Sequence, residues 1–423
     1  MAWKIPPSTY DKINHFAGFA PTAVSLQQMI RFGQNPSQGT LLKASQFLAE
    51  ELPIRLSHRV KELDELPENL NKMPSINRVK EWYAQSFEEL VSFPPPQLPE
   101  DIQDALRVKA PTPLPEATDN PSLESHYYRS SQPDKGKMRI PLDKRYYGST
   151  KDIIWPPEVH DYNDRFTKCL QKIKARHDPT VMTVARGILE WKHSKKSDRI
   201  GLSIQQFLDR FHMSRIGIRF LIGQHIALNT LPPHPEYVGI ICKQANIFDM
   251  CTESIENAKF VASDHYCLFK APEVQLVCPE DLAFPYVPGH LAHIIFELLK
   301  NSLRATIERF GADHPGEYPP IKVVVVEGKE DITIKISDEG GGIPRSAIPL
   351  IWTYMYTTME AATLDDVTSD FNAPMAGFGY GLPLSRLYAR FFGGDLRLIS
   401  MEGYGTDVYI HLNRLGESKE PLQ

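Results

Sequence analysis

Apolar residues recur at the spacing of a helix through most of the N-terminal half of the chain. In residues 40–56, leucine and phenylalanine return at three- to five-residue intervals, and similar patterns fill residues 10–90 and 161–229. Thr40 stands where the N-cap of the first long helix is expected. Helices of this kind pack together, so we expect a four-helix bundle within residues 1–230.

The pattern changes to alternation in the C-terminal half. Ile332, Ile334 and Ile336 alternate with polar residues, as in a strand with one buried face. Further strands are predicted at 321–326, 395–400 and 406–412, and helices at 290–310 and 383–392. The predicted fold class is therefore α+β and multidomain: an α/β sandwich at 231–416 follows the helical bundle, and a short tail at 417–423 ends the chain.

A proline-rich stretch interrupts the helical half at about residues 97–150. It carries many of the 35 prolines and few periodic apolar positions. Because proline fixes φ and lacks an N–H donor, we expect a flexible insertion here. A second break, LPPHPEY at residues 231–237, marks the boundary between the two domains.

Composition narrows the class of protein. The 423 residues include 47 basic and 52 acidic ones, and the formal net charge of −5 argues against a general nucleic-acid binder. No apolar run reaches the ~18 residues of a membrane-spanning helix, so no membrane insertion is expected. The five cysteines are scattered and form no CxxC pair, which argues against structural zinc and favours a reducing compartment.

One predicted helix carries a narrow polar stripe. At about 100° per residue, five polar side chains fall within an arc of about 100°: His293, Glu297, Lys300, Asn301 and Arg304. Apolar residues cover the remaining surface of the helix, so the stripe points to a site on an otherwise buried element. A solvated helix face is the alternative interpretation.

Two glycine-rich motifs follow this helix. DEGGGIP at residues 338–344 comes directly after the alternating strand, and GFGYGLP at residues 377–383 leads into a predicted helix. Glycine lets the backbone approach a ligand closely, and N–H groups at a helix N-terminus bind phosphates. Each motif alone is also compatible with an ordinary turn. Neither GxGxxG nor GxxxxGK[ST] occurs, so a Rossmann site and a P-loop are not supported.

In their order along the chain, the polar helix, the two glycine motifs and GTD at residues 405–407 resemble the ATP site shared by gyrase, Hsp90, bacterial histidine kinases and MutL. The resemblance implies that Asn301 holds Mg²⁺ and that Asp338 accepts the adenine amino group. Gly340 and Gly342 would let the nucleotide lie close, and residues 343–376 would form a lid. The loop over the triphosphate would comprise Gly377, Phe378, Gly379, Tyr380, Gly381 and Leu382.

Longer matches narrow the resemblance to the mitochondrial 2-oxoacid dehydrogenase kinases, and within them His293 and the preceding AFPYVPGH resemble the pyruvate branch. They include HIIFELLKNSLRAT, SDEGGGIP, WTYMYTT, PMAGFGYGLPLSRLYARFFGGDL and GYGTDVYIHL, and in the N-terminal half FLAEELPIRLSHRV, WYAQSFEEL and SRIGIRFLIGQHIAL. The resemblance extends over nearly the whole chain outside the insertion.

This narrower resemblance implies roles for individual residues. Glu297 would be the general base for a substrate hydroxyl, oriented by His293 one helical turn earlier. Lys300 and Arg304 would help to neutralise the phosphates. Thr357 and Thr358 would contact the nucleotide from the lid, and Thr406 would lie beside the adenine pocket.

The resemblance also implies an allosteric pocket for a 2-oxoacid in the N-terminal bundle. The matching positions are Tyr83, His177, Arg215 and Arg219. A pair of arginines suits a carboxylate. Helix-surface salt bridges with a buried structural histidine are the alternative.

The implied activity is Mg-ATP-dependent phosphorylation of a serine on the E1 component of the pyruvate dehydrogenase complex, which inactivates the complex. The implied partners are E1 and the lipoyl domain of E2, the implied assembly is a homodimer, and the implied location is the mitochondrial matrix. The chain departs from the animal members in its longer insertion and in its shorter C-terminal tail, which leaves the mode of dimer formation open.

Four alternatives remain. RIGIR and residues 41–59 are closer to the branched-chain kinase, which makes branched-chain E1 the alternative substrate. A true histidine kinase would need a phosphoacceptor, and His58 lacks the expected flanking residues. A conformational ATPase has the same Glu297–Asn301 spacing, but the helical bundle precedes the ATP domain here, which argues against this reading. A non-enzymatic scaffold protein would be expected to lack some of the residues of the ATP site, and here all the motif residues are present.

Overall fold

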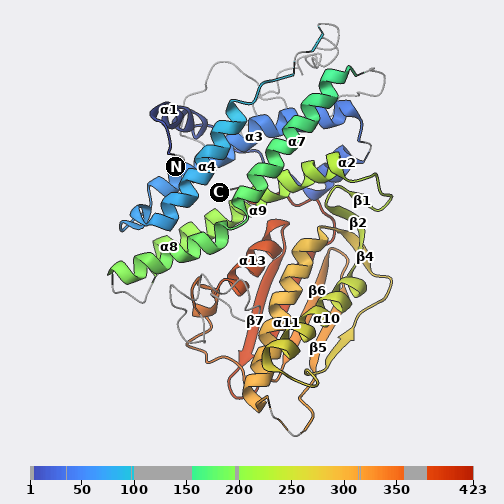
Figure 1. Ribbon diagram of the computed structural model, residues 1–423. Coiled ribbons are helices and arrows are strands. Elements are labelled where there is room, and N and C mark those ends of the chain that lie inside the picture. The colour runs from blue at the N-terminus through green and yellow to red at the C-terminus, as the bar shows by residue number, and fades with distance from the viewer. Residues whose placement is uncertain are drawn as a thin grey trace, which may run out of the picture.

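The computed structural model describes residues 4–34, 36–96, 98–99, 155–195, 200–312, 314, 316–356 and 379–422. Within these ranges, a layer of long helices lies against a sandwich made of a mixed sheet and the helices on one of its faces (Figure 1). The α+β fold class predicted from the sequence is confirmed. The proline-rich insertion falls almost entirely outside the described residues.

Long helices form the N-terminal layer. They are α3 (Gln38–Asp64), α4 (Pro74–Val91), α7 (Pro157–His177), α8 (Thr180–Lys195) and α9 (Leu202–Thr230), with α1 (Pro7–Phe16), α2 (Leu26–Gly33) and the 3-10 turn η1 (Leu70–Lys72) beside them. α3 packs against α4, α7 and α9, and α4 also packs against α8. The helical packing expected from the periodicity is therefore present. The assignment of residues 1–230 and 231–416 to separate domains stays a prediction.

The first long helix begins earlier than its apolar pattern indicated. Ser37 is the N-cap of α3, and its Oγ accepts a hydrogen bond from the Thr40 N–H at 3.2 Å. The prediction that Thr40 is the N-cap is therefore wrong. The serine hydroxyl satisfies one of the amides that the first helical turn leaves unpaired, so the helix starts at Gln38.

The sandwich is built on a five-stranded sheet in the order β3-β5-β6-β8-β7. Its strands are β3 (Val274–Val277), β5 (Ile321–Glu327), β6 (Asp331–Asp338), β7 (Asp395–Met401) and β8 (Gly405–Asn413), and its helices are α10 (Ile247–Tyr266), α11 (Pro288–Phe310) and α13 (Gly381–Phe391). β3 pairs with β5 in parallel, and the other neighbouring strands are antiparallel. α11 packs on β6, where Ile332, Ile334 and Ile336 are fully buried, so the alternating pattern identified the covered face.

The short elements between the two layers could not be located from the pattern. They are β1 (Tyr237–Val238), β2 (Ile241–Asn246), β4 (Ala283–Tyr286) and the 3-10 turn η3 (Leu350–Trp352). β1, β2 and β4 form a second, antiparallel sheet, and β2 contacts α2. Strands of this length contain too few residues to show a period of two.

The C-terminal strap, residues 417–422, returns from β8 to the helical layer and ties the two layers together. Glu420 is 4% exposed, and its carboxylate pairs with Arg55 of α3, which also binds Glu51 at 2.8 Å. The Glu420 carboxylate accepts a hydrogen bond from the Val24 N–H at 3.2 Å, and the Glu420 N–H donates to the Val24 carbonyl at 3.0 Å. Burial opposes the charge of Arg55, but the two carboxylates together raise its pKa, so the pair stays ionised.

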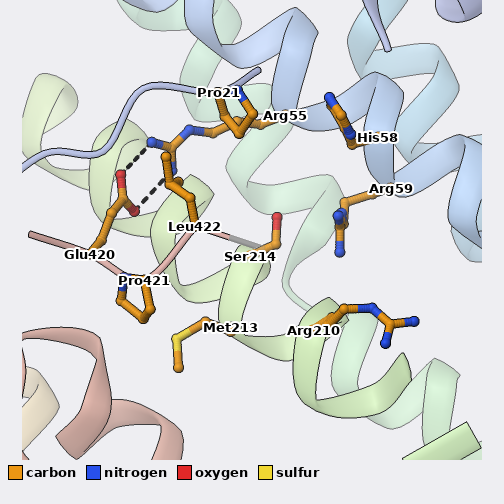
Figure 2. Close-up of a pocket in the computed structure, with 10 residues that line it drawn as sticks. All are labelled: Pro21, Arg55, His58, Arg59, Arg210, Met213, Ser214, Glu420, Pro421 and Leu422. Atoms are coloured by element: carbon orange, nitrogen blue, oxygen red, sulfur yellow. Dashed lines mark hydrogen bonds and ion pairs between the residues drawn. The ribbon is translucent and has the colours of Figure 1, made fainter. Parts of the chain in front are cut away.

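A cavity lies beside this ion pair (Figure 2). Pro421 and Leu422 of the strap line it together with Ser214 of α9. On the same helix, Gly217 faces the ion pair, because a Cβ there would lie 2.8 Å from the Glu420 carboxylate and 2.9 Å from Arg55. A glycine at this point of α9 therefore lets the strap approach the helix backbone.

Replacing Glu420 tests the strap. Glu420→Ala leaves the buried Arg55 with one carboxylate instead of two, so we expect the free energy of unfolding to fall by about 3 kcal/mol. Urea denaturation measures the change. Glu417→Ala, an exposed position on the same strap, is the matched control and should lie within about 0.5 kcal/mol of the unchanged protein. Equal stability of the two variants would show that the buried pair does not hold the strap.

Candidate functional site

The polar stripe of α11 contains an ion pair that is largely removed from solvent. Lys300 Nζ lies 2.8 Å from Glu297 Oε1, with the two side chains 10% and 16% exposed. Asn301, the next residue, is exposed, and Arg304 binds Glu308 at 2.7 Å on the following turn. A solvated face would leave the lysine in water, so the buried ion pair favours the interpretation of the stripe as part of a site.

The Glu297 carboxylate lies against the first residue of α13. A Cβ placed on Gly381 would stand 2.5 Å from Glu297 Oε2, so any other residue at this position would displace the carboxylate. The first turn of a helix carries unpaired N–H groups and a partial positive charge, which favour a carboxylate beside it. Leu382 follows in the same turn and is half-buried, and Tyr380, the N-cap residue, is buried.

His293 lies on the same side of α11 as Glu297 but is held differently. Its buried Nε2 has no hydrogen-bond partner among the described residues, and its ring stands edge-on to Tyr388 of α13 at 5.0 Å between centroids. Burial lowers the pKa of His293, the charge of Glu297 opposes the change, and Lys300 and Arg215 add to it. The imidazole is therefore neutral near pH 7.

Asp338 ends β6 as a buried carboxylate with two hydrogen-bond donors. Oδ2 accepts from the Ser302 hydroxyl at 2.9 Å, and Oδ1 accepts from the Gly340 N–H at 2.9 Å. Burial raises the pKa of Asp338, and the hydrogen bonds oppose the rise. The sequence analysis missed Ser302, which lies beside Asn301 on α11 and orients this carboxylate. No sequence pattern marked it.

The glycines of the first motif bring backbone segments together. A Cβ on Gly340 would stand 2.5 Å from the Ala305 Cβ, and Gly342, with φ +70°, would meet the Met401 carbonyl at 2.1 Å. Gly379, with φ +72°, likewise lies against the backbone of Tyr356. These contacts explain the need for glycine through packing. Any additional contact with a nucleotide stays a prediction.

The turn after β6 is fixed by Ser400 and Arg309, which no sequence pattern marked, together with the predicted Thr406. Ser400 Oγ accepts a hydrogen bond from the Ile343 N–H at 2.7 Å and lies 2.9 Å from Thr406 Oγ1. Thr406 is buried and pairs with Asp338 across β8 and β6. At the end of α11, Arg309 donates to three main-chain carbonyls of the same region: those of Glu339, Gly403 and Tyr404.

The described part of the expected lid, residues 343–356, is bound to α9 through Tyr354. Gln205 of α9 accepts from the Tyr354 N–H at 2.9 Å and donates to the Tyr354 carbonyl at 3.3 Å, and the Tyr354 hydroxyl donates to Asp209 at 2.9 Å. The Tyr354 and Tyr380 rings pack together at 5.1 Å. Four predicted site residues lie outside the described part of the chain: Thr357, Thr358, Gly377 and Phe378.

The four residues predicted for an allosteric pocket do come together in the helical layer. The Tyr83 and His177 rings stack at 4.4 Å, and Arg219 lies 2.8 Å from Asp178. The positive charges of Arg215 and Arg219 act to lower the pKa of both Tyr83 and His177. Burial lowers the pKa of His177 to about 3, so the histidine is neutral and the cluster carries a net positive charge from its arginines.

Arg215 is the member of this cluster without a local carboxylate partner. Its buried Nε has no hydrogen-bond partner among the described residues, and burial lowers its pKa. A cation held in this way favours the approach of an anion. His177 Nε2, by contrast, is satisfied by Ser86 Oγ at 3.0 Å.

Two further observations concern the ligands that the chain could hold. Within the described ranges, no three or more His, Cys, Asp or Glu side chains gather as a metal site would require. In the same part of the chain, none of the helices combines the length and the apolar character needed to span a bilayer.

Comparison with known proteins gives consistent similarities along the whole chain. Residues 23–242 match the family model described as mitochondrial branched-chain alpha-ketoacid dehydrogenase kinase, and residues 286–415 match the model described as histidine kinase-, DNA gyrase B-, and HSP90-like ATPase. The mitochondrial [pyruvate dehydrogenase (acetyl-transferring)] kinase of Schizosaccharomyces pombe is 47% identical, over 98% of each chain. The Arabidopsis thaliana kinase of the same name is 39% identical, over 99% of this chain and 97% of its own. Human isozyme 3 is 36% identical, over 99% of this chain and 90% of its own.

The ionisation of Asp338 gives a testable pH dependence. The pKa of Asp338 is higher in the folded protein than in the unfolded chain. The protonated side chain therefore stabilises the fold in acid, and this stabilisation is lost as the pH rises through the raised pKa. Asp338→Asn removes the ionisation, so we expect the variant to resist urea at least as well as the unchanged protein at about pH 7, with the difference shrinking towards about pH 4.

The matched control for this measurement is Asp331→Asn, an exposed position at the start of the same strand. It should show no such pH-dependent gain. A loss of stability in Asp338→Asn that grows with pH would mean that the ionised carboxylate stabilises the fold, contrary to the assignment.

Proposed function

Because the chain belongs to the family of mitochondrial pyruvate dehydrogenase kinases, we propose that it is a protein-serine kinase that phosphorylates the E1 component of the pyruvate dehydrogenase complex with ATP and so inactivates the complex. The observation that carries the proposal is the position of Glu297, paired with Lys300 and set against the N-terminus of α13, in a chain similar to these kinases over almost its full length.

In this proposal Glu297 accepts the proton of the substrate serine hydroxyl. Its carboxylate is held by Lys300 on one side and by the first turn of α13 on the other, so it is directed before a substrate arrives. His293 stays neutral beside it, so Lys300 is the cation that pairs with Glu297. ATP supplies the phosphoryl group, and the protein contributes positioning and charge neutralisation.

The residues present fit a nucleotide with Mg²⁺. Asp338 is a buried acceptor of the kind that an adenine amino group needs, and Thr406 lies opposite it on β8. Mg²⁺ prefers one or two protein oxygens together with phosphates and water, and the exposed Asn301 carboxamide offers one oxygen. Lys300 and Arg304 lie on the same stripe and would balance phosphate charge. The chain beyond Gly379 enters α13, whose N-terminus suits the phosphates.

The arginine cluster in the helical layer is proposed as the site for a small 2-oxo carboxylate. Arg215 and Arg219 would bind the carboxylate, and the stacked Tyr83 and His177 would form an apolar and hydrogen-bonding wall. The proposal is supported by the lack of a carboxylate partner for Arg215 among the described residues.

The proposed assembly includes a homodimer, the E2 lipoyl domain as a docking partner and the mitochondrial matrix as location. The face of the sheet opposite the helices exposes apolar side chains at Val326, Ile399 and Met401, each 58–60% exposed. Apolar side chains exposed on a sheet face are typical of an interface, so this face is the proposed contact between two copies. The location and the lipoyl partner are supported by the family alone.

A second candidate substrate is the branched-chain 2-oxoacid dehydrogenase E1. It is favoured by the family model that matches residues 23–242, whose description names the branched-chain kinase. Both candidates use the same residues and the same chemistry, so they differ only in the recognition of E1.

Glu297→Gln tests the general base. The change keeps the size of the side chain and removes the proton acceptor, so phosphate transfer to E1 should fall by about 10²- to 10⁴-fold while ATP binding survives. Single-turnover labelling measures transfer, and calorimetry measures ATP binding. Asn301→Ala should instead lose Mg-ATP binding.

The matched control is Glu256→Gln on the exposed surface of α10, which should transfer phosphate at the unchanged rate. Full transfer activity in Glu297→Gln would exclude the residue as the base.

Substrate choice is tested by labelling purified pyruvate and branched-chain E1 components side by side, each with its lipoylated E2 core. We expect incorporation from Mg-ATP into serine of the pyruvate E1, with loss of its activity. Labelling of the branched-chain E1 alone would retain the mechanism and change the substrate. Hydrolysis of ATP without labelling of either E1 would instead indicate a conformational ATPase.

A further inference from the structure

Tyr354 is held to helix α9 by three hydrogen bonds. The side-chain amide of Gln205 bonds both main-chain polar groups of Tyr354: its oxygen accepts from the N–H at 2.9 Å, and its nitrogen donates to the carbonyl at 3.3 Å. The Tyr354 hydroxyl donates to the carboxylate of Asp209, one helical turn further along α9, at 2.9 Å. Tyr354 is 2% exposed, so its main chain and its ring are both fixed relative to this helix.

The residue after Tyr354 has a strained backbone. Met355 has a φ of +64°, in the left-handed region that residues other than glycine rarely adopt. Such a conformation persists only where the surrounding structure fixes it. The hydrogen bonds to Tyr354 act directly before the strained residue and stabilise the turn. Gly379 lies against this turn, because a Cβ there would stand 2.4 Å from the Tyr356 carbonyl oxygen.

The ring of Tyr354 supports Tyr380, the residue directly before α13. The two rings pack at 5.1 Å between centroids, and His212 of α9 contacts both, at 5.4 Å from Tyr354 and 5.7 Å from Tyr380. Burial lowers the pKa of His212 to about 3, so its ring is neutral. The Tyr380 hydroxyl is buried without a hydrogen-bond partner among the described residues. Ring packing against Tyr354 and His212 therefore fixes the position of Tyr380.

Tyr380 in turn sets the start of α13, which packs against both α9 and α11 (Figure 1). It is the N-cap residue, and its carbonyl accepts a hydrogen bond from the Leu384 N–H at 3.0 Å. Gly381, the first residue of α13, lies so close to Glu297 that a Cβ would stand 2.5 Å from Oε2. A displacement of Tyr380 would therefore move the helix start relative to the carboxylate.

We propose that Tyr354 is a positioning residue for phosphoryl transfer: anchored to α9 by Gln205 and Asp209, it holds the N-terminus of α13 against Glu297. The inference rests on the proposed kinase function and deepens it, because it names a residue that acts on the candidate base through Tyr380 and Gly381. Catalysis depends steeply on placement, and a misplacement of about 1 Å can cost about 10²-fold in rate. Lys300 still pairs with Glu297 when the helix start is loosened, so the expected loss is partial.

Tyr354→Phe tests the anchor. The variant keeps the ring against Tyr380 and removes the hydroxyl, and the exposed Asp209 carboxylate can bond to water instead, so the fold should tolerate the change. With the pyruvate E1 as substrate, we expect kcat to fall about tenfold and the KM for ATP to stay within about twofold. Single-turnover labelling under conditions where the variant is fully folded measures the rate of transfer.

Variants of Asp209 show whether the effect runs through this hydrogen bond. Asp209→Asn keeps an oxygen that accepts from the Tyr354 hydroxyl, so it should transfer phosphate within about twofold of the unchanged rate. Asp209→Ala should lose as much as Tyr354→Phe. The double variant should lose no more than either single variant, because all three lack the same bond.

Tyr318→Phe is the matched control, because it also removes a tyrosine hydroxyl, one that donates to the Gly311 carbonyl beyond the end of α11. It should behave as the unchanged protein. An unchanged kcat in Tyr354→Phe, or additive losses in the double variant, would overturn the inference. Parallel losses in kcat, in apparent affinity for ATP and in stability to urea would also overturn it, since they indicate general damage.

The two possible failures are distinguishable. If the unchanged protein labels no E1, the proposed function is wrong and the inference falls with it. If the unchanged protein labels E1 and Tyr354→Phe labels it equally fast, the inference alone is wrong.

Discussion

The packing of α11 between the sheet and α13 is the constraint on which the candidate site depends. The apolar side of α11 covers β6. The polar stripe of α11 therefore lies on another side of the helix, where Glu297 faces the start of α13. There Glu297 meets Gly381, and only a residue without a side chain leaves room for the carboxylate. The candidate base, its lysine partner and the helix N-terminus are brought together by this one contact, which no single motif contains.

Helix α9 gives the fold its second organising element. It contacts the strap through Gly217, the described part of the expected lid through Gln205 and Asp209, and α13 through direct helix packing. One helix therefore contacts the strap, the described part of the expected lid and α13. A buried cation such as Arg215 costs stability unless an anion pairs with it, so its burial suits a group that binds an anionic ligand.

Particular residues show which features of the fold and the site could be predicted from the sequence. The period of two at Ile332, Ile334 and Ile336 identified a buried strand face, because alternation directly reflects which side chains meet the core. The stripe on α11 was visible for the same reason at the helical period. The N-cap at Ser37 was missed, because a helix can begin before its apolar pattern does. Ser302 and Ser400 were missed, because a serine that bonds to a distant strand leaves no periodic signal.

The sequence by itself determined the two kinds of layer, the buried faces of the main strand and helix, and the resemblance that identified the candidate base, the Asp338 acceptor and the glycine motifs. These features are local, since they depend on period and on short motifs. Only the tertiary structure decided that Glu297 lies against α13, that Glu420 closes on Arg55 about 365 residues away, and that the Tyr388 ring packs edge-on to His293. Such contacts depend on how separate elements pack, and spacing along the chain carries no information about that geometry.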